Sequence, residues 1–115
     1  MITDPDPKSI HRVAIHRHAF GYRVDPGKLR ITRTDEDQPV VRFTNHTDKE
    51  IVLEFPARLF SEEAKSVALG PFRGEGYRQD FALVADEGDY EYAALVTAAG
   101  IEAEGSSRPR ILVER

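Results

Sequence analysis

Short apolar runs that alternate with polar residues constrain this chain most, because a period of two fits a strand and not a helix. Val13 and Ile15 alternate with Arg, Ala and His residues, and the same period recurs around Phe43, Leu53 and Ile111. No window of the sequence has the stripe of apolar side chains that an amphipathic helix needs. The sequence therefore predicts an all-β fold.

Turn-forming residues separate these runs at intervals of about eight to twelve residues, a spacing typical of sandwiches and barrels. The turns are rich in Pro, Gly, Asp and Asn and fall at residues 25–27, 35–39, 45–48, 70–71 and 87–89. About seven or eight strands in this order predict a Greek-key β-sandwich, with an immunoglobulin-like sandwich as the alternative. One short helical turn is expected at residues 61–66, where Ser61 can cap a turn that carries Glu62 and Glu63.

The length of 115 residues suits one hydrophobic core. We expect a single domain at residues 10–115, preceded by a disordered or extended segment at residues 1–9. The longest uncharged run, residues 92–101, is too short to cross a bilayer, so no membrane insertion is expected. No apolar leader follows Met1. The expected location is the cytoplasm, or the periplasm or another extracytoplasmic compartment if a leader has been removed.

The absence of cysteine excludes disulfides, thiolate metal sites and cysteine nucleophiles. The net charge of −4 and the pI near 5.5 argue against general nucleic-acid binding, which needs a basic surface.

Charge is unevenly distributed along the chain. Residues 1–33 hold seven basic and three acidic side chains, whereas residues 34–115 hold nine basic and seventeen acidic ones. Two interpretations are open. The basic part can face an acidic partner, or basic and acidic strands can pair across one sheet.

The order of several motifs resembles that of cupredoxins over residues 10–115. Residues 24–31 resemble the family's P-x-x-I-x-V strand, and residues 41–45 its V-x-F-x-N motif. The V-x-L-x-P-G, G-x-Y-x-F and G-x-I-x-V motifs have counterparts at residues 67–71, 88–92 and 110–114. The resemblance implies a Greek-key β-sandwich of cupredoxin type.

The family's copper ligands have no counterpart in this sequence. On the same resemblance, the first His of the family falls at Ile51, its Cys at Ala94 and its second His at residues 96–99. The axial Met is also missing, because Met1 is the only methionine. A type 1 copper site needs the thiolate and both imidazoles, so electron transfer through such a site is excluded.

A narrower resemblance is to cysteine-free cupredoxin-like domains associated with bacterial iron uptake, which use carboxylates as metal ligands. Residues 45–54 resemble their N-x-S-D-K-x-V-E-F-E motif and keep Glu54, but Val52 replaces the first Glu of E-F-E. The acids that follow G-x-Y-x-F in those domains are replaced by Ala93, Ala94 and Leu95.

Two groups of side chains are candidate metal ligands. His16 and His18 share one face of a strand, with His11 nearby in sequence, and two imidazoles can bind Cu(II), Zn(II) or Ni(II). The second group is acidic: Glu50 and Glu54 with the two Glu residues of the expected helical turn could bind a hard cation or Fe(III). The alternative for both groups is a solvated polar face.

No catalytic pattern is present, neither G-x-S-x-G nor a phosphate loop nor H-E-x-x-H. We therefore expect no enzyme activity. His46 fits a solvated turn and Tyr77 fits packing within a sheet, while Phe20, Phe60 and Phe72 near strand ends can form an apolar patch for a partner.

These patterns predict a non-enzymatic cupredoxin-like binding or accessory module that lacks a blue-copper site, has no resident cofactor and binds a protein partner. One alternative is labile handling of copper, zinc or iron through surface His and carboxylate groups. A second is a structural homo-oligomer, such as a homodimer formed through a strand edge.

Overall fold

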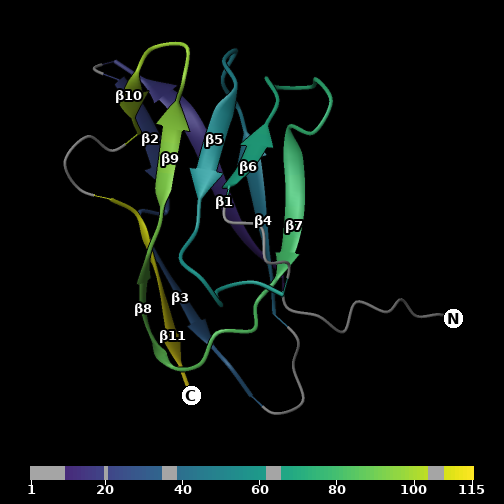
Figure 1. Ribbon diagram of the computed structural model, residues 1–115, viewed down its shortest axis with the longest axis vertical. Coiled ribbons are helices and arrows are strands. Elements are labelled where there is room, and N and C mark those ends of the chain that lie inside the picture. The colour runs from purple at the N-terminus through teal and green to yellow at the C-terminus, as the bar shows by residue number, and fades with distance from the viewer. Residues whose placement is uncertain (1–9, 20, 35–38, 62–65, 104–107) are drawn as a thin grey trace, which may run out of the picture.

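The computed structural model describes residues 10–19, 21–34, 39–61, 66–103 and 108–115. These ranges contain strands and no helix, as Figure 1 shows. The strands are β1 (Ile10–His18), β2 (Gly21–Asp25), β3 (Lys28–Thr32), β4 (Val40–Asn45), β5 (Ile51–Glu54), β6 (Ser66–Leu69), β7 (Arg78–Ala82), β8 (Gly88–Glu91), β9 (Ala93–Val96), β10 (Ile101–Glu102) and β11 (Arg110–Glu114). A helix long and apolar enough to span a bilayer is absent from the described ranges.

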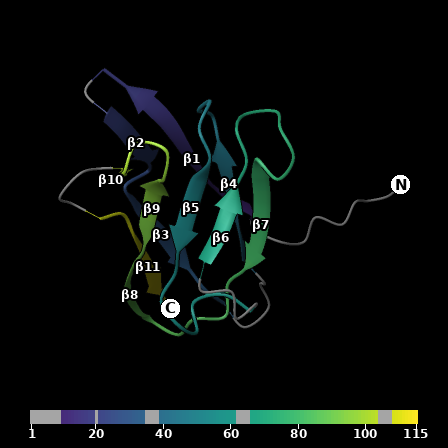
Figure 2. The same cartoon turned by 45° about the horizontal axis from the view of Figure 1, so that its top comes forward.

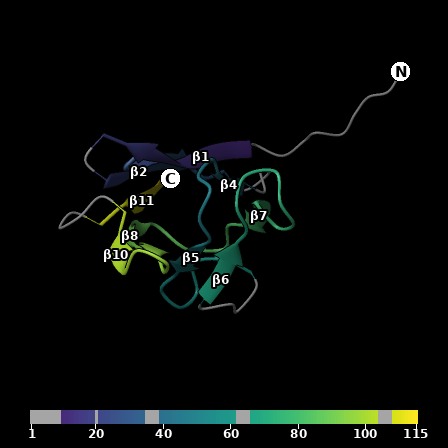
Figure 3. The ribbon, with the colours of Figure 1, turned by 90° about the horizontal axis from the view of Figure 1, so that it is seen from above.

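The strands form three hydrogen-bonded sheets, in the orders β2-β1-β4-β7, β10-β9-β5-β6 and β3-β11-β8. Two of the pairings, β1 with β4 and β3 with β11, are parallel and join strands far apart in the chain. Seen from above, β1 and β2 lie on one side of the molecule and β5, β6 and β10 on the other (Figure 3). The predicted all-β sandwich is confirmed.

The structure has more strands than the sequence predicts. Residues 88–96, which begin with the G-x-Y-x-F counterpart, form two strands that separate at Tyr92. The N–H of Tyr92 donates to the carbonyl of Pro109 in register with the β8–β11 pairing, but Pro109 has no N–H to return a bond, so the ladder ends there. The short strands β6 and β10 are also additional. The expected helical turn at residues 61–66 falls largely outside the described residues, and so does the expected segment at residues 1–9.

Alternating burial builds the core, since every second side chain of a strand points inward. Phe43 lies at its centre. The centroid of its ring lies 5.4 Å from that of Phe55, 5.9 Å from that of Phe81 and 5.6 Å from that of Tyr92. Edge-to-face aromatic packing of this kind fills the space between the layers and holds them at a fixed distance.

The layers are also joined along one side. Nε2 of Gln79 on β7 donates to the carbonyl oxygen of Ala68 on β6 at 2.9 Å, and an isolated bridge pairs Phe60 with Leu83. Two neighbouring loops lie at one end of the sandwich: the β4–β5 loop, residues 46–50, and the β6–β7 loop, residues 70–77 (Figure 2).

Candidate functional site

The positions that resemble cupredoxin copper ligands lie in the hydrophobic core. Ile51 begins β5 and pairs with Val96 of β9, and Ala94 of β9 pairs with Leu53. The side chains of Ile51, Ala94 and Val96 are all 0% exposed. None of them offers a nitrogen, oxygen or sulfur ligand, so these residues do not fit a type 1 copper ion. Apolar packing fills the region instead.

At the same end of the sandwich, Asn45 ties the two loops together. It is the last residue of β4 and is fully buried. Its Nδ2 donates to the carbonyl oxygens of Lys49 at 2.7 Å and Gly70 at 2.8 Å. Its Oδ1 accepts from N and Oγ1 of Thr47. Because Phe72 N also donates to the carbonyl of Thr47 at 2.9 Å, the loops are hydrogen-bonded to each other.

An aromatic and cationic group, which we call the end cluster, lies on these loops. It consists of His46, Phe72, Arg73, Tyr77 and Arg78. The ring centroids of His46 and Phe72 are 4.9 Å apart, and those of Phe72 and Tyr77 are 5.4 Å apart. The guanidinium carbon of Arg73 lies 5.2 Å from the Phe72 centroid. That of Arg78 lies 5.8 Å from the Tyr77 centroid. Phe72 is 40% exposed, so the cluster presents a large apolar side chain to solvent.

The tip of the β6–β7 loop has unusual backbone conformations. Arg73 adopts φ = 67°, a left-handed conformation shared among the described non-glycine residues only with Arg58. This conformation costs a residue with a Cβ about 1–2 kcal/mol. A Cβ at Gly70 would collide with the carbonyl oxygen of Glu75, so the loop can close this tightly only with glycine there. The loop thus holds an arginine where glycine would be less strained.

His16 and His18 lie side by side on the outer face of β1. Val13 and Ile15 are buried on its inner face, 1% and 0% exposed, so the two imidazoles point away from the core as expected. His16 is half-buried and His18 is exposed.

His11 is separated from this pair. It pairs with Val41, which is buried, and therefore belongs to the inner face of β1. A carboxylate close to the pair is that of Asp25 on β2, with 4.0 Å between His16 Nε2 and Asp25 Oδ2. No group of three or more His, Asp or Glu side chains within the described ranges could hold a metal ion.

Glu54 is the last residue of β5 and Glu50 lies in the loop directly before that strand, on a different sheet from His16, and both are exposed. Glu62 and Glu63, expected to complete the acidic group, are outside the described residues. The structure therefore places the two candidate metal groups on different sheets and brings no third described ligand to either.

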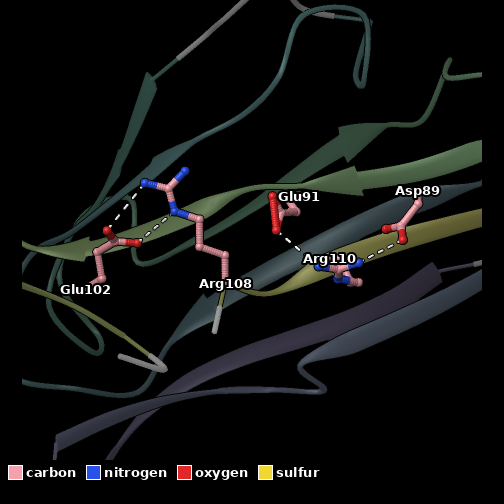
Figure 4. Close-up of polar contacts among 5 residues, drawn as sticks. All are labelled: Asp89, Glu91, Glu102, Arg108 and Arg110. Atoms are coloured by element: carbon pink, nitrogen blue, oxygen red, sulfur yellow. Dashed lines mark hydrogen bonds and ion pairs between the residues drawn. The ribbon is translucent and has the colours of Figure 1, made fainter. Parts of the chain in front are cut away.

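Ion pairs connect charged side chains of β8 and β10 to two arginines at and just before the start of β11 (Figure 4). Arg110 lies between two carboxylates, 2.8 Å from Asp89 and 3.1 Å from Glu91. Arg108 pairs with Glu102 at 3.1 Å, and this hydrogen bond raises the pKa of the guanidinium. Acidic and basic groups compensate one another on this surface.

Each interpretation of the charge asymmetry has a counterpart in the fold. Arg30 of β3 lies 3.9 Å from Glu114 of β11, an ion pair between the basic and acidic parts of the chain. On the outer face of the β2-β1-β4-β7 sheet, Arg12 and Arg42 lie side by side and share one carboxylate, that of Asp80. Arg42 binds Asp80 with two hydrogen bonds of 2.8 and 3.0 Å, which lower the pKa of the carboxyl group. Cross-strand pairing therefore accounts for only part of the asymmetry.

A shallow, open depression lies beside the turn between β9 and β10. It is lined by Leu95, Val96, Thr97, Gly100, Ile101 and Glu102. Its wall is mostly apolar and carries a single carboxylate, so it lacks the convergent polar groups of a catalytic pocket.

The end cluster is the feature that sequence reasoning found only in part. The sequence predicts that Phe72 lies near a strand end, but it assigns His46 to a turn and Tyr77 to packing within a sheet. The available signal is the segment at residues 70–76, Gly-Pro-Phe-Arg-Gly-Glu-Gly, where an aromatic residue and an arginine stand among turn formers. Its contact with His46 depends on the Asn45 hydrogen bonds, which no local pattern reveals.

Comparisons with known proteins identify the fold. Neither a protein-family model nor a curated protein matches the sequence. Among solved structures, a purple cupredoxin from Nitrosopumilus maritimus matches with 15% identity and a TM-score of 0.59, covering 90% of this chain and 99% of that one. An oxidized amicyanin mutant matches with 17% identity and a TM-score of 0.54, covering 96% of this chain and 86% of that one. The chain therefore has the cupredoxin fold, without the residues that hold type 1 copper.

Proposed function

We propose that this protein is a non-enzymatic binding module that uses the end cluster to recognise a protein partner. The observation that carries the proposal is the contrast at one end of the sandwich. The positions of the copper ligands, Ile51 and Ala94, are buried in the core. Phe72, three residues after the Leu69 that pairs with Ile51, is 40% exposed, and its N–H is held by the carbonyl of Thr47.

The composition of the end cluster supports protein recognition. Aromatic residues and arginine are the side chains most enriched at the centres of protein interfaces. The Asn45 hydrogen bonds order both loops in advance, so little conformational entropy remains to be lost on binding. Phe72 is not part of the hydrophobic core, so packing of the core does not explain its exposed position.

The test is native affinity capture with three immobilised proteins: wild type, Phe72→Ser and Val84→Ser. Val84 is also 40% exposed but follows the far end of β7, so its variant controls for loss of apolar surface. We expect a partner that wild type and Val84→Ser retain, that Phe72→Ser loses, and that binds again when purified. Equal retention by all three proteins, or none by wild type, would contradict the proposal.

Labile metal handling is the second candidate, because His16 and His18 both face outward on β1 with Asp25 near one of them. It predicts that calorimetric titration with Cu(II) or Zn(II) detects stoichiometric binding to wild type and none to a His16→Ala, His18→Ala double variant. Glu50→Gln, Glu54→Gln tests the acidic group in the same way. Heats that do not differ between wild type and both variants would reject this candidate.

A further inference from the structure

Arginines outnumber carboxylates on the outer face of the β2-β1-β4-β7 sheet. Alternation places four arginines and two aspartates on that face, namely Arg12, Arg23, Arg42, Arg78, Asp25 and Asp80. The register sets Arg12 beside Arg42, and Arg42 beside Asp80. This sheet therefore has an excess of positive charge although the whole chain is acidic.

One carboxylate serves three of these arginines. Arg42 binds Asp80 with both of its hydrogen bonds, while Arg12 and Arg78 are near enough to stabilise the same negative charge. Among the described residues, neither Arg12 nor Arg78 forms an ion pair of its own. Within the part of the chain that the structure describes, two positive charges on this face therefore have no carboxylate of their own.

This surface continues into the end cluster. Arg78 begins β7 directly after Tyr77, and its guanidinium lies over the ring of Tyr77. Tyr77 in turn packs edge-on against the exposed ring of Phe72. A partner that contacts Phe72 therefore has Arg78 beside it and Arg12 further along the sheet.

We propose that the partner presents an acidic segment of protein, which crosses this sheet from β7 over β4 to β1, with an apolar side chain against Phe72 and carboxylates against Arg78 and Arg12. The inference rests on the proposed function and adds the chemistry of the partner. Charge complementarity favours this occupant, since uncompensated arginines attract carboxylates and repel basic surfaces. The surface formed by β8, β10 and β11, where acidic and basic side chains form ion pairs, lacks that preference.

The probe is a short fluorescein-labelled peptide in which Glu and Asp flank a central Leu-Phe pair, compared with its counterpart carrying Gln and Asn. Anisotropy measures affinity, and amide chemical-shift changes locate the binding site. We expect only the acidic peptide to bind, with shifts at Phe72, Arg73 and Arg78. Affinity should fall as salt rises from about 0.01 M to about 0.1 M, since the screening length shrinks from about 30 Å to about 10 Å.

Three variants test the charges. Arg78→Gln and Arg12→Gln should each weaken binding about two- to fivefold, the range for exposed ion pairs. Asp80→Asn should tighten it, because it removes the carboxylate that competes with the peptide. A variant that merely disturbed the surface would weaken binding instead. Arg30→Gln, on β3 of a different sheet, is the matched control and should have no effect.

The outcomes separate the two proposals. If capture depends on Phe72 but the acidic peptide does not bind, the inference fails and the proposed function stands. If capture also fails, both fail.

Equal affinity of both peptides, or weaker binding by Asp80→Asn, would overturn the acidic assignment. Binding to a DNA oligonucleotide or to phosphatidylserine vesicles that Phe72→Ser leaves unchanged would overturn it in favour of a general polyanion site. Concentration-dependent dimers in light scattering, lost in Arg78→Gln, would make a second copy the occupant and also overturn it.

Discussion

Asn45 Nδ2 donates a hydrogen bond of 2.8 Å to the carbonyl oxygen of Gly70, 25 positions along the chain. This bond fixes the β6–β7 loop against the end of β4. The shape of the end cluster therefore depends on a buried amide that does not belong to it.

The free energy of unfolding of the Asn45→Ala variant should be about 2 kcal/mol lower than that of wild type, because several buried polar groups lose their hydrogen-bond partner. Urea denaturation followed by circular dichroism measures this. Thr32→Ala, at an exposed position of β3, is the control and should change the free energy of unfolding little. The variant should also bind the acidic peptide less tightly, since Phe72 is no longer held. Unchanged stability would show that the Asn45 bonds do not order the loops.

Arg73→Gly should separate binding from stability. Glycine adopts the left-handed conformation at Arg73 without steric cost, so the variant should be as stable as wild type or more stable, by up to about 1 kcal/mol. Its binding to the acidic peptide should be weaker, since a positive charge beside Phe72 is removed. Thermal unfolding and anisotropy on the same protein give both values. Arg58→Gly, with the same backbone conformation, should keep full binding.

The Arg42–Asp80 ion pair should make a small pH-dependent contribution to stability. Arg42 lowers the pKa of Asp80 in the folded protein. The contribution is therefore complete above the unfolded value of about 4 and is lost as the pH falls through the lower folded value. Both side chains reach solvent, so we expect less than about 1 kcal/mol at neutral pH.

Unfolding of wild type and Asp80→Asn between neutral pH and about pH 3 tests this, since the difference between them should shrink only below about pH 4. In an Arg42→Gln background the same substitution should have little effect. A difference that stays constant down to the lowest pH would contradict the assignment.

The Ile51→His variant should be strongly destabilised, although Ile51 is the position at which the resemblance places the first copper-binding histidine of cupredoxins. The imidazole would enter a site that is 0% exposed, and the neighbours Ala94 and Val96 offer it no polar partner. Burying an unpaired polar group and losing apolar contacts should together cost about 3 kcal/mol or more. Ile51→Val, the volume control, should cost about 1 kcal/mol. Recovery of stability by added Cu(II) would show that this region still accommodates metal.

Removing metal should not change partner binding. The proposed contacts of Phe72, Arg78 and Arg12 need no bridging ion, so dialysis against EDTA should leave the anisotropy curve of the acidic peptide unchanged. A shift of that curve, reversed by Zn(II) or Cu(II), would connect His16 and His18 to recognition instead.

Most of the fold follows from local patterns. The period-two runs around Val13 and Phe43 predict strands, and the turn formers between them predict the sandwich. The separation of β8 and β9 at Tyr92 is harder to predict, because it occurs where Tyr92 faces Pro109, a residue from a distant segment that has no N–H to extend the ladder.

The candidate site is less accessible to sequence reasoning than the fold. The alternation around Ile15 correctly orients His16 and His18, because strand geometry alone decides which face a side chain takes. The packing of His46 against Phe72 joins two loops through tertiary hydrogen bonds. Such contacts between distant segments leave no period in the sequence.

The position of β11 determines when a growing chain can become a sandwich. β11 is the middle strand of its sheet, with β3 on one side and β8 on the other, and the pair Arg110 with Lys28 joins residues 82 positions apart in the 115-residue chain. Contacts so distant in sequence form slowly, because a long loop must close before any of them contributes. Until β11 arrives, β3 and β8 each expose an unpaired strand edge, so the interval before its insertion is when the nascent protein is most exposed to aggregation.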